Sequence, residues 1–136
     1  ILHAMMRLFD QEKDFMLKPR PLPGLFKYLD MPYYHPTMFV PKEIYDDVGV
    51  YSLDYQYAMD YDFVLRALGK GYRFQYLPKL ITHFRHGGSA NSNALACHKE
   101  VLESQIRNGL NLLVCRLTYY FKVMVNKLKG LVAKSL

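Results

Sequence analysis

The chain has 136 residues, of which 51% are hydrophobic and 22% charged, and its formal net charge is +6. This length suits one domain, and the apolar content favours a globular protein over an intrinsically disordered one. The excess positive charge indicates an anionic partner, such as a phosphorylated substrate, a membrane lipid or a nucleic acid.

Cysteine content and hydropathy restrict the class further. Cys97 and Cys115 are far apart and lack CxxC spacing, which argues against a zinc site or a disulfide framework and fits a reducing compartment. The sequence shows neither a secretory signal nor a run of eighteen apolar residues, so we expect a cytoplasmic location. Because the first residue is Ile1 rather than Met, we also expect a fragment or a trimmed chain.

The first forty residues predict short elements. Residues 1–8 and 15–17 are apolar and flank a polar run, which favours a hairpin, although Met, Ala and Leu also suit a helix. Residues 19–24 contain three prolines and predict a stiff connector that is neither helix nor central strand. One helical turn over 25–29 and a short strand at residues 39–40 are expected to follow.

Two helices are predicted next, separated by a loop over residues 51–57. Residues 41–49 begin with a proline and end with Gly49, which suits a helix C-terminus. Residues 58–68 form the central helix, with an apolar face that includes Phe63, and Asp62 and Arg66 are spaced to pair along it.

The remainder predicts strands and then helices. Alternation over residues 72–76 and 80–85 indicates two strands, and the pattern is helical from residue 94, with a break at Asn108-Gly109. We therefore divide the chain into residues 1–95 and a basic helical region of residues 96–136. An apolar stripe follows the last helix, and it consists of Leu113, Leu117, Tyr120, Met124, Leu128 and Leu131.

Asp60 is the strongest candidate for chemistry. It lies at the start of the central helix, where backbone N–H groups are unpaired and the helix dipole is positive. A carboxylate placed there stays ionised and is held rigidly, as a general base requires. The alternative is a plain helix cap.

Four blocks of sequence then carry a resemblance. The blocks are residues 35–42, 45–51, 58–66 and 84–89. Their order and spacing resemble the second half of the family 2 glycosyltransferases of the GT-A fold, over the stretch from Pro19 to Asn93. The resemblance implies an α/β fold, the C-terminal half of a Rossmann-like GT-A domain with a mixed sheet, followed here by a helical extension.

The resemblance also implies an activity: inverting transfer of a sugar from a nucleotide-diphosphate sugar to an acceptor hydroxyl. The acceptor would be a cell-surface polysaccharide or a lipid-linked glycan. The family's Glu-Asp or Ser-Asp pair, whose Asp is the base, corresponds to Met59-Asp60 here. Such a base typically increases the reaction rate by a factor of about 10²–10⁴.

Further residues are predicted to contact substrate. The alternative for Asp62 is a structural pairing with Arg66. The equal alternative for His35 is a loop histidine bonded to backbone, and for Arg85 and residues 87–89 it is a simple turn that ends a strand. These predicted substrate contacts are His35, Asp62, Arg85, Gly87, Gly88 and Ser89.

The family's divalent metal, Mg²⁺ or Mn²⁺, is held by an Asp-x-Asp motif that follows an apolar strand in the first half. Asp60-Tyr61-Asp62 matches the Asp-x-Asp pattern, but no apolar strand precedes it in the sequence. We therefore expect that the nucleotide-binding half is missing, that this chain holds no metal of its own, and that it is inactive alone.

The last helix is the best signal of a partner. Its apolar face and flanking Lys and Arg residues suit the inner surface of an anionic membrane, contacted by residues 110–136. Packing on the missing half, or on a second subunit of a homodimer, is the alternative. A non-catalytic basic module that binds membrane or RNA is the rival function. The basic residues are otherwise dispersed and no RNA-module signature appears, so we expect no nucleic-acid partner.

Overall fold

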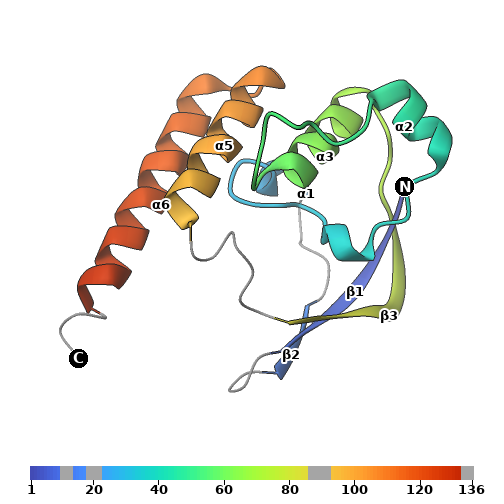
Figure 1. Cartoon of the computed structure of the whole chain (residues 1–136), viewed down its shortest axis with the longest axis horizontal. Helices are drawn as coiled ribbons and strands as arrows, with labels where there is room; N and C mark the ends of the chain where they lie inside the picture. Colours follow the sequence, from blue (N-terminus) through green and yellow to red (C-terminus); the bar gives the residue numbers. More distant parts are fainter. Residues whose placement is uncertain (10–13, 18–22, 86–92, 133–136) are drawn as a thin grey trace.

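The computed structural model describes residues 1–9, 14–17, 23–85 and 93–132. A small sheet lies on one side, the α5–α6 helical pair on the other, and α1, α2 and α3 lie along one end of the fold (Figure 1). The elements are β1 (Leu2–Phe9), β2 (Asp14–Leu17), α1 (Pro23–Phe26), the 3₁₀ turn η1 (His35–Thr37), α2 (Lys42–Val48), α3 (Met59–Gly69), β3 (Gln75–Arg85), α5 (Ala94–Arg107) and α6 (Leu112–Val132).

The sheet has the order β2-β1-β3 and is mixed, because β1 pairs antiparallel with β2 and parallel with β3. The predicted hairpin and the predicted α/β class are thereby confirmed. The prediction of two separate strands over residues 72–76 and 80–85 is wrong, since β3 is one strand from Gln75 to Arg85. Its register shifts where Leu77 faces Ala4 and Leu80 faces Met5. Pro78 lies in this shift, where its missing N–H is tolerated.

The helices follow the predictions with small differences. Gly49 closes α2 with a φ of 87°, and Gly109 lies between α5 and α6 with a φ of 71°, so both breaks use the left-handed conformation that glycine adopts easily. The connector prediction is wrong at its end, because α1 begins at Pro23, a residue type accepted in a first helical turn. The predicted strand at residues 39–40 is a single bridge between Phe39 and Leu2.

Helix α3 is buried on two sides. Phe63 and Ala67 are fully buried against Ile44 and Val48 of α2. The opposite face, formed by Ala58, Tyr61 and Leu65, packs on Val101 of α5 and on Leu110 beyond it. Burying such faces is the main source of stability in a small domain, so α3 is a rigid support for any group at its start. The predicted division between residues 95 and 96 falls inside α5.

Candidate active site

Asp60 is the second residue of α3. Its Oδ1 accepts a hydrogen bond of 2.8 Å from the backbone N–H of Tyr61, and its side chain is 23% exposed. The carboxylate is therefore held by the start of the helix and is not sealed in the interior.

His35 lies against the same carboxylate. Its Nδ1 is 2.6 Å from Oδ2 of Asp60, and its side chain is 46% exposed. The two residues belong to separate sequence blocks, and the fold brings them together. A histidine that donates through Nδ1 orients the carboxylate and is itself oriented by it.

The turn that carries His35 is anchored to the sheet. Thr37 is buried, and its Oγ1 accepts a 3.1 Å hydrogen bond from the N–H of Ala4 in β1. The hydroxyl of Thr82 in β3 donates to the carbonyl of Pro36 at 2.8 Å. Strands β1 and β3 therefore both hold η1, and these two threonines were not among the residues singled out from the sequence.

The start of α3 is held by a second acid. Glu100 of α5 accepts hydrogen bonds from the N–H groups of Gln56, Tyr57 and Ala58 at 3.1, 2.7 and 3.0 Å. Ala58, the N-cap residue, has no side-chain oxygen for this purpose, so a carboxylate from another helix satisfies backbone donors beside the helix start. No local pattern in the sequence identifies Glu100, because the contact depends on how α5 packs.

Asp62 is buried and hydrogen-bonded to other side chains of the protein. Its side chain is 3% exposed, and Oδ2 accepts a 2.7 Å hydrogen bond from Nε of Arg66, which confirms the predicted pairing. Oδ1 accepts from Ser104 at 3.0 Å and from Asn108 at 3.1 Å. With both oxygens engaged and buried, Asp62 is not placed to contact a substrate as predicted; it joins α3 to α5 instead. Arg66 also donates to three carbonyls at the end of α2, the nearest being that of Val48 at 2.6 Å.

The remaining predicted contacts are Arg85 and residues 87–89. Arg85 is exposed at the last position of β3. Gly87, Gly88 and Ser89 lie outside the described residues.

The described ranges do not form a metal site by themselves. Across them, no group of three or more His, Cys, Asp or Glu side chains is placed to hold a metal ion. Asp60 and His35 amount to two potential ligands, and each directs its polar atom at the other.

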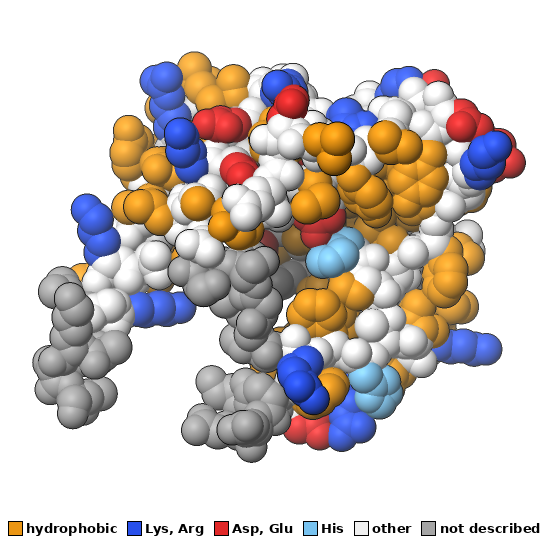
Figure 2. Space-filling model, viewed as in Figure 1, with side chains coloured by type: hydrophobic (Ala, Val, Ile, Leu, Met, Phe, Trp, Pro, Cys, Tyr) orange, Lys and Arg blue, Asp and Glu red, His pale blue; other side chains and the backbone are white. Residues whose placement is uncertain are grey.

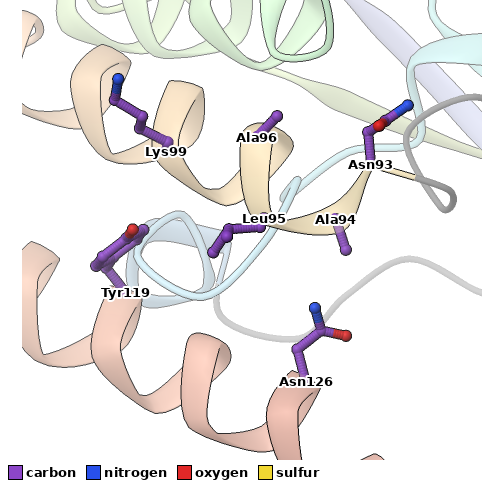
Figure 3. A pocket seen from close by; sticks show the side chains of 7 residues that line it. All are labelled: Asn93, Ala94, Leu95, Ala96, Lys99, Tyr119 and Asn126. Carbon is purple, nitrogen blue, oxygen red and sulfur yellow. The ribbon is translucent and has the colours of Figure 1, made fainter. Parts of the chain in front are cut away.

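A hollow lies elsewhere, between the first turn of α5 and the middle of α6 (Figure 3). Its volume is about 680 Å³, and Tyr119 and Asn126 of α6 face the side of α5 that carries Ala94 and Leu95. Asp60 and His35 do not line it. Its lining mixes apolar and polar groups without a buried charged group, so it indicates no particular ligand.

No model of a protein family, no curated protein and no solved structure matches this chain.

Proposed function

We propose that this chain is the acceptor-side half of an inverting glycosyltransferase of the GT-A fold, with Asp60 as the general base. The donor would be a nucleotide-diphosphate sugar, bound by a second half that supplies the nucleotide site. The observation that carries the proposal is the 2.6 Å contact between Asp60 and His35. This contact brings together residues from two of the four sequence blocks that carry the resemblance. The point where they meet is the partly exposed carboxylate of Asp60.

The chemistry needs only one carboxylate on the acceptor side. The oxygen of the acceptor hydroxyl attacks the anomeric carbon, and the bond from that carbon to the diphosphate oxygen breaks. The nucleoside diphosphate leaves with the bonding electron pair, and the hydroxyl proton passes to Asp60. A sugar hydroxyl is a poor nucleophile, so transfer of its proton to a positioned base lowers the barrier.

The geometry of Asp60 is compatible with this role. An ionised carboxylate offers about four acceptor positions. The N–H of Tyr61 and Nδ1 of His35 each occupy one of these positions, on different oxygens. Acceptor positions therefore remain for an incoming hydroxyl, and the plane of the carboxylate is fixed from both sides. His35 is a positioning residue in this scheme.

The test uses the polypeptide that contains this chain together with its nucleotide-binding half. Transfer is measured with a panel of nucleotide-diphosphate sugars that carry a label on the sugar. Thermal unfolding is recorded for each variant. Asp60→Asn should lower kcat by about 10²–10⁴ with little change in KM. Asp47→Asn is the matched control, because Asp47 is an exposed aspartate on α2 that pairs with Lys70. It should leave kcat unchanged.

The proposal fails if Asp60→Asn transfers sugar at the rate of the unmodified protein. The 136 residues alone should give no transfer, and detectable transfer by them would contradict the division of labour between two halves. His35→Ala should lower kcat less than Asp60→Asn does, because the base itself remains.

A further inference from the structure

Helix α6 has one packed face and one exposed face. The packed face contains Cys115, Thr118, Tyr119 and Lys122, of which Cys115 is fully buried. Lys122 is partly buried beside His98 and Leu102 of α5, and this burial lowers its pKa. The predicted apolar stripe, as far as Leu128, lies on the opposite side.

The exposed face is almost entirely apolar. Its large hydrophobic side chains are between 52% and 68% exposed, a degree of exposure that is unusual for a contiguous set. Hydrophobic and basic side chains follow one another over the edge of the molecule formed by α6 (Figure 2). The exposed face consists of Leu113, Leu117, Tyr120, Phe121, Met124 and Leu128.

The charge of this region has one sign. The last acidic residue of the sequence is Glu103, and six basic residues follow it. At about 100° per residue, Arg116 and Lys127 lie along one border of the exposed face, and both are exposed. The face therefore combines an apolar surface with a cationic border and has no acid to repel an anionic partner.

We propose that α6 lies flat on the surface of a membrane that contains anionic lipids, with its exposed apolar face buried at the boundary of the headgroups and acyl chains. In this position the long stems of Arg116 and Lys127 reach the phosphates of the headgroups. Within the described residues, no helix has the length and apolar character needed to cross a bilayer. This inference does not depend on the proposed function.

A second copy of the chain fits this face less well. Two α6 helices packed face to face and antiparallel would place their cationic borders near each other, and α6 has no Asp or Glu to pair with either border. Like charges at such distances are unfavourable, whereas anionic lipids neutralise them.

The experiment is co-sedimentation of the full chain with vesicles, either of phosphatidylcholine alone or of phosphatidylcholine mixed with phosphatidylglycerol. The unmodified chain should bind the anionic vesicles and bind the neutral ones weakly. Leu117→Glu with Met124→Glu should reduce the partition coefficient at least about a hundredfold, because two apolar side chains that would be buried in the membrane are lost. The matched control is Leu53→Glu, since Leu53 is 98% exposed and lies outside α6. It should bind as the unmodified chain does.

A second pair of variants tests the charge. Arg116→Gln with Lys127→Gln should weaken binding to anionic vesicles about thirtyfold. Lys42→Gln with Lys79→Gln removes two exposed basic residues elsewhere and should have little effect. Equal binding to neutral and anionic vesicles would overturn the proposal. So would a dimer in sedimentation equilibrium that Leu117→Glu disrupts, in the absence of vesicle binding.

Discussion

Replacing Asp62 by asparagine should destabilise the fold, although the side chain keeps its size. Asp62 is almost fully buried and accepts hydrogen bonds from Arg66, Ser104 and Asn108. An asparagine presents an NH₂ group on one side, so either Arg66 or the two α5 donors would face another donor. Removing one partner of a buried ion pair generally costs about 3–5 kcal/mol. Arg66 is 25% exposed and keeps its carbonyl acceptors on α2, so we expect the lower end, about 3 kcal/mol.

Urea unfolding followed by circular dichroism measures this change directly. A domain of this size has a free energy of unfolding of about 5–15 kcal/mol, so a loss of about 3 kcal/mol is easily resolved. Asp60→Asn is the matched control, because it makes the same chemical change two residues earlier in α3, on a partly exposed side chain. It should lower stability by less than about 1 kcal/mol. If Asp62→Asn unfolds within about 0.5 kcal/mol of the unmodified chain, the structural role assigned to Asp62 is refuted.

Three further predictions concern stability. Gly49→Ala should destabilise the chain by about 1 kcal/mol in urea unfolding, because the φ of Gly49 is 87°. Gly69→Ala is the control and should be neutral or slightly stabilising, because Gly69 is helical and has open space for a methyl group. Equal effects of the two substitutions would argue against the backbone explanation. Burial lowers the pKa of His3, so the unfolded chain binds a proton more readily than the folded one, and stability should fall as pH drops below about 6.5 towards that lowered pKa. His3→Phe should flatten this pH dependence of the urea midpoint, and an unchanged slope would exclude His3 as its source. Glu100→Gln should lower the free energy of unfolding by about 1 kcal/mol, because the acceptor for three backbone N–H groups loses its charge. The control is Glu103→Gln, at an exposed residue of the same helix, which should leave the free energy of unfolding unchanged. A Glu100→Gln variant as stable as the unmodified chain would contradict the capping role.

Local patterns were reliable where one signal decided the outcome. Gly49 marked the end of α2, and the Asn108-Gly109 pair marked the break between α5 and α6, because few other residues adopt the required backbone conformation easily. The spacing of Asp62 and Arg66 similarly predicted a contact within one helical turn. The alternation in β3 was visible as two strands, and only pairing with β1 showed that the chain continues past Pro78.

The sequence alone indicated α2, α3, α5 and α6, the acid at the start of α3 and the amphipathic character of α6, because these depend on neighbours within a few residues. It favoured the hairpin but left a helix open there, and pairing of β1 with β2 decided between them. Only the tertiary structure decided that His35 meets Asp60, that Glu100 holds the start of α3, and that Asp62 is buried. It also decided which side of α6 packs on α5 and which stays exposed. Contacts between residues distant in the chain depend on how whole elements pack, and a local pattern carries no record of that packing.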